Sequence, residues 1–177
     1  MNLPTILTMM RIVLVVPVMI CIFMDNLPAQ IVTLVCFIIA SVTDFIDGRL
    51  ARRRKEVTNL GKFLDPLADK MLVNLTFLAL VVLSAVPVWM FAVILVRDFM
   101  VDGLRMMAAT KHVTIAASKF GKLKTLVQMI TISLILINVI ANNSVLTIIN
   151  IILLYIVVML TVLSGIDYLY KGRKLVI

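Results

Sequence analysis

Four aspartates lie in two short clusters in the first half of the chain. Asp44 and Asp47 are three positions apart, and Asp65 and Asp69 are four apart. On a helix, such spacings place both members of a pair on one face. Carboxylates supply only oxygen ligands, which suit hard cations such as Mg²⁺ or Mn²⁺ rather than zinc. The pattern therefore predicts a site for one or two divalent cations, which could also bind a substrate phosphate.

Small and basic residues accompany the aspartates. Gly48, Ala51 and Arg52 follow the first pair on its helical face, and Gly61 lies four positions before the second pair. Small residues can simply allow close packing of membrane helices. Among metal ligands we interpret them as room for a flat substrate group, and Arg52 could hold a phosphate.

The chain that must position these residues is unusually apolar. Hydrophobic residues make up 63% of its 177 positions, and the mean hydropathy is +1.16. Soluble domains are closer to half apolar, so we infer that a lipid bilayer is the solvent. The net charge of +8 comes from Lys and Arg that flank the apolar runs. This pattern indicates lipid head groups and phosphate substrates rather than nucleic acid.

We predict an all-α integral membrane protein with six transmembrane helices in a single domain, residues 1–177. The helices are expected at residues 5–24, 29–54, 60–83, 88–109, 117–141 and 146–169. Each apolar run approaches the ~20 residues that a spanning helix needs. A short N-terminal segment of about ten residues carries polar side chains at every third position. It either lies in the head-group plane or simply begins the first span.

Lys and Arg are distributed unevenly among the connections. Three connections contain neither residue, at positions 25–28, 84–87 and 142–144. The other three segments are basic, at positions 52–55, 111–119 and 171–174. Because basic loops stay in the cytoplasm, we predict a multi-pass protein with both termini and the aspartate site on the cytoplasmic side.

The two aspartate pairs are expected at similar depth on antiparallel neighbouring helices. Asp44 lies fifteen residues from Ala29 at the outer end of its helix, and Asp69 lies fifteen from Ser84. At ~1.5 Å per residue, both are ~22 Å from the outer edge. An embedded Asp costs several kcal/mol, and four carboxylates together repel one another. Bound divalent cations would offset both penalties.

The stretch from Asp44 to Asp69 resembles the signature of the CDP-alcohol phosphotransferase family, D-x2-D-G-x2-A-R-x8-G-x3-D-x3-D. All eight specified positions match without a spacing error. The resemblance implies that Asp44, Asp47 and Asp65 hold a pair of Mg²⁺ or Mn²⁺ ions with the substrate pyrophosphate. It also implies that Asp69 joins the metal site and acts as general base on the acceptor hydroxyl. The residues expected to contact the CDP-lipid are Gly48, Ala51, Arg52 and Gly61.

The flanking segments are most similar to bacterial family members that make phosphatidylglycerophosphate. These segments are the start of the chain and residues 121–125 and 164–173. The resemblance implies transfer of a phosphatidyl group from CDP-diacylglycerol to glycerol 3-phosphate, with release of CMP. It further implies a homodimer in a bacterial-type cytoplasmic membrane. One departure is Asp98, where such proteins are expected to carry Glu after Arg97.

A phosphate-bearing acceptor needs cations within the membrane. Arg97 and Arg105 lie two turns apart in one predicted helix, and an embedded Arg is a functional hypothesis by default. We predict that Arg97, Arg105 and Lys122 bind the acceptor phosphate. Lys119 and Lys124 are interpreted as interfacial anchors whose side chains snorkel to the surface.

Other charged and aromatic residues flank this predicted acceptor site. Asp98 and Asp102 lie four positions apart, and we expect them to pair with the cations. Trp89, Tyr168 and Tyr170 are interpreted as interfacial anchors, the usual position of such rings in membrane proteins.

Three alternatives fit part of the pattern. A related transferase could use inositol phosphate, serine or phosphatidylglycerol as acceptor, because the aspartate motif handles only the shared donor. A cation transporter or channel could also carry embedded carboxylates. However, all four aspartates cluster on one side and leave no polar path through the outer half of their helices. An inactive homologue is the third alternative, and the complete motif argues against it.

Overall fold

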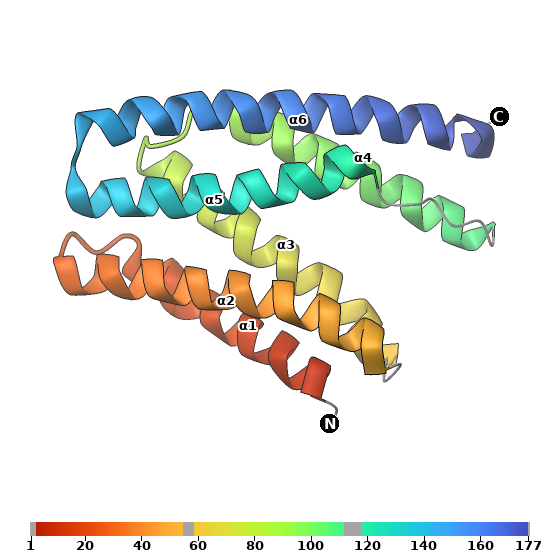
Figure 1. Cartoon of the computed structure of the whole chain (residues 1–177), viewed down its shortest axis with the longest axis horizontal. Helices are drawn as coiled ribbons and strands as arrows, with labels where there is room; N and C mark the ends of the chain where they lie inside the picture. Colours follow the sequence, from red (N-terminus) through yellow and green to blue (C-terminus); the bar gives the residue numbers. More distant parts are fainter. Residues whose placement is uncertain (1–2, 55–58, 112–117, 177) are drawn as a thin grey trace. The chain divides into compact units, whose positions relative to one another are not determined.

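The computed structural model is all-helical in the part of the chain that it describes. It describes the backbone of residues 3–54, 59–111 and 118–176, and the side chains of residues 9–43, 70–108, 110–111 and 118–173. The helices are α1 (Leu3–Cys21), α2 (Leu27–Arg54), α3 (Asn59–Val82), α4 (Val88–Thr110), α5 (Lys119–Ala141) and α6 (Ser144–Val176) (Figure 1). The predicted all-α class is confirmed.

The helix boundaries follow the hydrophobic pattern closely, with one exception at the end of the chain. α6 continues to Val176, whereas the pattern predicted an end near residue 169. The extra turns are rich in Lys and Arg, which are good helix formers. Hydropathy marks where the apolar stretch ends, and the helix continues beyond it. At the other end, α1 is continuous from Leu3, as expected if this segment begins the first span.

Local hydrogen bonds close the three connections that lack Lys and Arg. The Asn26 side-chain oxygen accepts a hydrogen bond from the Ala29 N–H at 2.9 Å and caps the start of α2. Ser84 and Asn142 adopt left-handed φ angles of 58° and 45° after α3 and α5. The Ala85 N–H then donates to the carbonyl five residues earlier, at 2.9 Å. This pattern is a common helix C-terminal cap.

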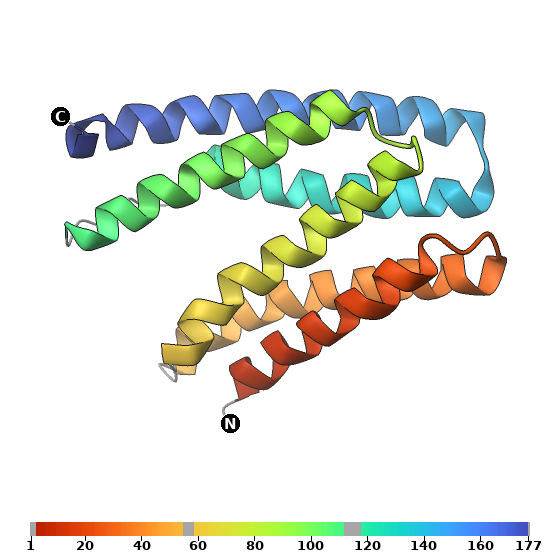
Figure 2. The ribbon, with the colours of Figure 1, turned by 180° about the vertical axis from the view of Figure 1, so that it is seen from behind.

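The chain divides into two compact units. The first unit comprises Met1–Ala85 and Ile132–Asn143, and the second comprises Val86–Thr131 and Ser144–Ile177. In the first unit, α1 packs against both α2 and α3 (Figure 2). Among the described residues, α2 and α3 contact each other over a shorter stretch than either contacts α1. α1 therefore joins the two helices that carry the aspartate motif.

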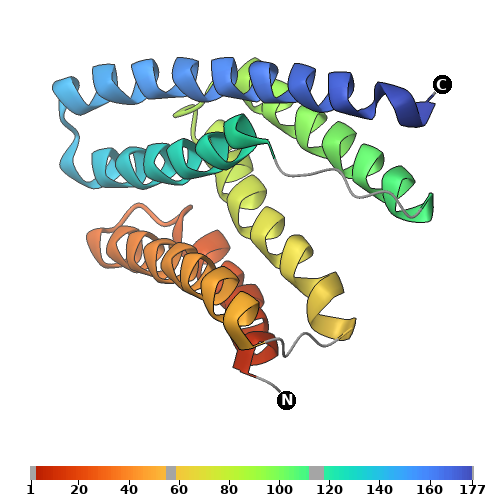
Figure 3. The ribbon, with the colours of Figure 1, turned by 45° about the vertical axis from the view of Figure 1, so that its right-hand side comes forward.

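In the second unit, α4 and α6 lie side by side and run in the same direction (Figure 3). The rings of Trp89 and Tyr155 are 6.2 Å apart at one level of the pair. Further along, a Cβ added to Gly172 would lie 3.4 Å from a methyl group of Leu104. Each contact joins a residue of α4 to one almost the same number of positions later in α6, as a parallel pair requires.

α6 carries large apolar side chains on its exposed face, and its buried face holds polar side chains beside Leu154, Val157 and Leu160. The large exposed residues recur at helical spacing: Ile148, Ile152, Tyr155, Met159, Val162 and Ile166. The buried polar residues are Asn150, Thr161 and Ser164, together with the Tyr168 ring and hydroxyl. A helix of a soluble protein usually exposes polar residues instead of such a run of large apolar ones. This distribution is typical of a helix that faces lipid.

Within the residues whose side chains the structure describes, two helical segments are long and apolar enough to cross a membrane, namely Lys119–Ala141 and Ser144–Arg173. α4 is also of spanning length, but Arg97, Asp98, Asp102 and Arg105 interrupt its apolar sequence. These charged residues are the starting point for the site.

Candidate functional site

The aspartate motif spans the end of α2 and the start of α3. The backbone is helical at Asp44, Asp47, Asp65 and Asp69, as the predicted spacing argument requires. Their side chains lie outside the described residues, so the convergence of the carboxylates stays a prediction. The same applies to the residues predicted to contact the CDP-lipid, which are Gly48, Ala51, Arg52 and Gly61.

The chemistry of the motif fits a hard divalent cation. Its four potential ligands are all carboxylates, with no thiol or imidazole among them, and this donor set suits Mg²⁺ or Mn²⁺. Elsewhere, within the residues whose side chains the structure describes, no group of three or more acidic, His or Cys residues gathers. The motif is therefore the candidate metal site of this chain.

Arg97 places a charged side chain on the buried face of α4, between apolar residues. Ile94 and Val101, one turn before and one turn after it, are almost fully buried. Only 13% of the Arg97 side chain is exposed. A guanidinium in such a position is costly unless charged or polar groups surround it.

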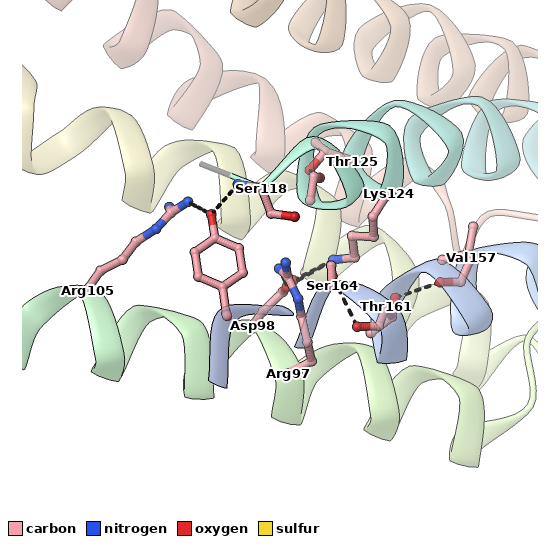
Figure 4. Close-up of polar contacts among 11 residues, drawn as sticks. Arg97, Asp98, Arg105, Ser118, Lys124, Thr125, Val157, Thr161 and Ser164 are labelled. Carbon is pink, nitrogen blue, oxygen red and sulfur yellow. Dashed lines mark hydrogen bonds and ion pairs between the residues drawn. The ribbon is translucent and has the colours of Figure 1, made fainter. Parts of the chain in front are cut away.

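An acidic residue and a lysine complete an ion triad with Arg97. Asp98 Oδ1 lies 2.9 Å from Arg97 Nη1, and Lys124 Nζ lies 2.9 Å from both carboxylate oxygens of Asp98 (Figure 4). The predicted pairing of Asp98 with nearby cations is confirmed. Lys124 is only 3% exposed, so its interpretation as a snorkelling anchor was wrong. Its ammonium group instead compensates the Asp98 carboxylate inside the second unit.

Tyr168 lies between the two arginines of α4 and is 1% exposed. Its ring centroid is 5.5 Å from the Arg97 guanidinium carbon and 5.2 Å from that of Arg105. Its hydroxyl oxygen accepts hydrogen bonds from Arg105 Nη2 and from the Ser118 N–H, the latter at 3.2 Å (Figure 4). The interpretation of Tyr168 as an interfacial anchor was therefore wrong, because sequence position near a helix end did not reveal its buried face.

Two glycines make room for Arg97. A Cβ added to Gly121 of α5 would lie 3.3 Å from Arg97 Nη2 and 3.6 Å from a ring carbon of Tyr168. A Cβ added to Gly165 of α6 would lie 3.4 Å from Arg97 Cγ. The arginine thus passes between two helices at the points where each lacks a side chain. The sequence reasoning missed this role, although both glycines lie in segments that resembled the family.

The start of α5 presents a polar face to the interior. Its buried residues are Ser118, Lys124, Gln128 and Thr131. In the described part of the chain, the buried atoms there and on α4 that have no hydrogen-bond partner include Gln128 Nε2, Arg97 Nε and Ser118 Oγ. Buried donors are nearly always satisfied in proteins. Unpartnered buried donors of this kind are a reason to look for a polar ligand beside Arg97.

The predicted acceptor residues differ in their surroundings. Arg97 and Arg105 meet at Tyr168, whereas Lys122 is exposed on α5. Lys119, which was interpreted as an interfacial anchor, is also exposed there. Among the contacts described, Arg97 and Lys124 flank the Asp98 carboxylate, and Arg105 joins them through Tyr168, which also contacts Arg97. We refer to these four residues and Tyr168 as the cationic cluster. Its net positive charge can attract an anionic ligand.

Arg97 also borders an apolar pocket of about 410 Å³ between α4 and α6. Apart from Arg97 and Thr161, its lining consists of apolar residues and Gly165. The aliphatic stem of Arg97 therefore contacts apolar surroundings while its guanidinium group meets Asp98 and Tyr168. This division is common for long cationic side chains in membranes.

Comparison with known proteins gives a consistent result. The model of the CDP-alcohol phosphatidyltransferase family matches residues 1–165. The matched segment includes the aspartate motif, Arg97, Asp98 and Arg105, and it ends three positions before Tyr168.

Curated relatives match almost the whole chain. A Bacillus subtilis protein is 38% identical over 184 residues, which cover 97% of this chain and 95% of the relative. A Rickettsia bellii protein is 38% identical over 175 residues, covering 98% and 96%. A Haemophilus influenzae protein is 37% identical over 177 residues, covering 97% and 94%. All three are named CDP-diacylglycerol–glycerol-3-phosphate 3-phosphatidyltransferase.

Proposed function

Because the chain belongs to the CDP-alcohol phosphatidyltransferase family, we propose that it transfers the phosphatidyl group of CDP-diacylglycerol to glycerol 3-phosphate. The products are phosphatidylglycerophosphate and CMP, and the step belongs to phospholipid biosynthesis. The names of the near full-length relatives support this choice of substrates. The structural observation that carries it is the cationic cluster, in which a buried donor of Arg97 lacks a partner.

The cluster suits an acceptor that carries a phosphate. Arg97 and Arg105 have planar guanidinium groups that can bind phosphate oxygens in pairs. Lys124 adds a third cation through Asp98, and Lys122, exposed on α5, is a further proposed phosphate ligand. A phosphomonoester dianion would compensate the net positive charge. Serine lacks such a group, whereas inositol phosphate shares it.

The aspartate motif is proposed to handle the CDP-lipid. Asp44, Asp47 and Asp65 would hold divalent cations with Asp69, and the all-carboxylate donor set supports this role. Mg²⁺ or Mn²⁺ held there would compensate the charge of the pyrophosphate and would stabilise CMP as the leaving group. Asp69 would accept the proton of the acceptor hydroxyl. That oxygen then bonds to the phosphatidyl phosphorus as the bond from this phosphorus to the CMP oxygen breaks.

We further propose six membrane spans with both termini in the cytoplasm. The parallel direction of α4 and α6 supports this topology, because alternate helices of a serially threaded bundle cross the membrane in the same direction. The apolar exposed face of α6 supports its contact with lipid. The distribution of Lys and Arg supports the orientation.

The test is release of CMP by the purified protein in detergent with CDP-diacylglycerol and Mg²⁺ or Mn²⁺. Glycerol 3-phosphate, inositol phosphate, serine and phosphatidylglycerol are supplied in separate reactions. We expect release only with glycerol 3-phosphate. Release with another acceptor alone would overturn the proposed acceptor and leave the donor chemistry. No release with any acceptor would overturn the proposed reaction.

A further inference from the structure

We infer that Tyr168 is a positioning residue that fixes Arg97 and Arg105 for binding of the acceptor phosphate. This inference rests on the proposed function and deepens it. Tyr168 would not touch the reacting atoms. It would determine how tightly the protein binds a phosphate-bearing acceptor, through the two arginines that it contacts.

The ring of Tyr168 offsets the repulsion between the guanidinium groups of Arg97 and Arg105. Its centroid lies 5.5 Å from the Arg97 guanidinium carbon and 5.2 Å from that of Arg105. Both distances fall within the range of cation–π attraction, which is stronger where water is excluded. With 1% of Tyr168 exposed, the ring is a buried partner for both cations. An aliphatic side chain of similar size would offer neither of them any electrostatic attraction.

The hydroxyl of Tyr168 fixes the second arginine more specifically. It accepts a hydrogen bond from Arg105 Nη2 and another from the Ser118 N–H at 3.2 Å. Ser118 immediately precedes α5, Arg105 belongs to α4, and Tyr168 belongs to α6. The hydroxyl oxygen of Tyr168 on α6 therefore connects α4 with the residue that precedes α5. Arg105, whose side chain is otherwise largely exposed, is held toward the interior by this contact.

The packing around the ring leaves little freedom for an alternative position. Gly121 of α5 faces both Tyr168 and Arg97, and a Cβ there would lie 3.6 Å from the ring and 3.3 Å from Arg97 Nη2. Val101 and Leu104 of α4 bury the ring on another side. Since the ring is fixed and the two arginines contact it, the geometry assigns it the role of a spacer between them. A ligand phosphate would then meet donors that are already oriented.

The variant Tyr168→Phe separates the role of the ring from the role of the hydroxyl. It keeps the ring beside both guanidinium groups and removes only the acceptor oxygen. The matched control is Tyr170→Phe, because Tyr170 lies two positions later, is 63% exposed and contacts only the Arg173 guanidinium in the described cation–π contacts. Both variants keep an aromatic ring, so folding in detergent, monitored by circular dichroism and gel filtration, is expected to match the unmodified protein.

We expect Tyr168→Phe to raise the KM for glycerol 3-phosphate about tenfold, a typical effect of losing a hydrogen bond from a charged donor. The KM for CDP-diacylglycerol and kcat should change by less than about twofold. The lost interaction concerns only glycerol 3-phosphate and is made equally in the ground state and the transition state. Tyr170→Phe should leave all three constants unchanged. Adding Arg105→Ala to Tyr168→Phe should weaken acceptor binding no further than Arg105→Ala alone, because the hydroxyl acts through Arg105.

Binding of inorganic phosphate, measured by calorimetry without CDP-lipid, provides an independent readout. We expect Tyr168→Phe to weaken phosphate binding and Tyr170→Phe to leave it unchanged. Equal changes in the KM of both substrates, unchanged acceptor KM, or additive effects with Arg105→Ala would overturn the inference while the function stands. If the unmodified protein fails to use glycerol 3-phosphate, the proposed function fails. The phosphate measurement then decides the role of Tyr168 alone.

Discussion

Replacing Lys124 by Met tests whether the interior of the second unit depends on the ion triad. Lys124 Nζ lies 2.9 Å from both oxygens of Asp98, and the two side chains are only 3% and 13% exposed. Met has a similar length and shape but no charge. The substitution therefore removes the ammonium group and preserves most of the packing. Asp98 keeps one cationic partner, Arg97, at 2.9 Å.

The expected loss of stability follows from this geometry. At an effective dielectric constant of about 20, opposite unit charges 2.9 Å apart attract by ~6 kcal/mol. Removing the ammonium group also removes the free-energy cost of burying it, and this offsets part of the lost attraction. Breaking a buried ion pair typically costs ~3–5 kcal/mol. Because Arg97 still compensates Asp98, we expect the lower end, a loss of ~3 kcal/mol in the free energy of unfolding.

The assay is equilibrium unfolding in mixed micelles by titration with sodium dodecyl sulfate, followed by circular dichroism. Lys171→Met is the matched control. Lys171 contacts Asp167 at 2.7 Å, a shorter distance than in the buried pair, but the two side chains are 45% and 26% exposed. Exposed pairs contribute little because water screens them, so this variant should unfold like the unmodified protein.

A double-mutant cycle makes the test specific to the pair. Asp98→Asn removes the carboxylate charge that Arg97 and Lys124 both contact. If the two charges stabilise each other, Lys124→Met combined with Asp98→Asn should cost ~2 kcal/mol less than the sum of the single variants. Additive losses, or equal losses for Lys124→Met and Lys171→Met, would refute the reasoning from burial.

The remaining predictions concern the proposed reaction. Asp69→Asn should reduce kcat by at least about a hundredfold without changing the circular dichroism spectrum, and near-normal turnover would exclude Asp69 as the base. Arg97→Ala should raise the KM for glycerol 3-phosphate far more than that for CDP-diacylglycerol, and an equal rise in both would exclude a specific role in acceptor binding. Removal of divalent cations with EDTA should abolish CMP release, and added Mg²⁺ or Mn²⁺ should restore it. Persistent turnover in EDTA would contradict the metal assignment to the aspartate motif.

The helices could be predicted from the sequence because their main determinant is local. Long apolar runs separated by short turn-forming segments specify where a membrane helix begins and ends. The end of α6 differed because its last turns are polar and still helical. Helical state and membrane position are separate properties, and hydropathy reports only the second.

The surroundings of the acceptor residues were predicted less well. Arg97 and Arg105 were recognised because charged residues inside an apolar span are costly. Lys124 and Tyr168 were misinterpreted because both lie near the ends of the predicted helices, where Lys and Tyr are usually interfacial. Their burial depends on which face of α5 and α6 turns toward α4. That orientation arises from contacts between segments distant in sequence, which periodicity in one segment does not report.

The sequence also identified two glycines without showing what they do. Gly121 and Gly165 lay in segments that resembled the family, but nothing in the sequence showed that both face Arg97. A buried polar face on the first half of α5, including Gln128, was a possible signal. Polar residues recurring at helical spacing inside a membrane span indicate a polar interior, and this pattern would have pointed to Lys124.

The most direct test of the central claim is transfer of labelled glycerol 3-phosphate into lipid by the purified protein. With CDP-diacylglycerol and Mg²⁺ or Mn²⁺, we predict label in the organic phase as phosphatidylglycerophosphate and one CMP released for each labelled lipid formed. Asp69→Asn, analysed alongside, should form almost none. Label that stays in the aqueous phase while CMP is released, or no CMP at all, would contradict the proposed phosphatidyl transfer.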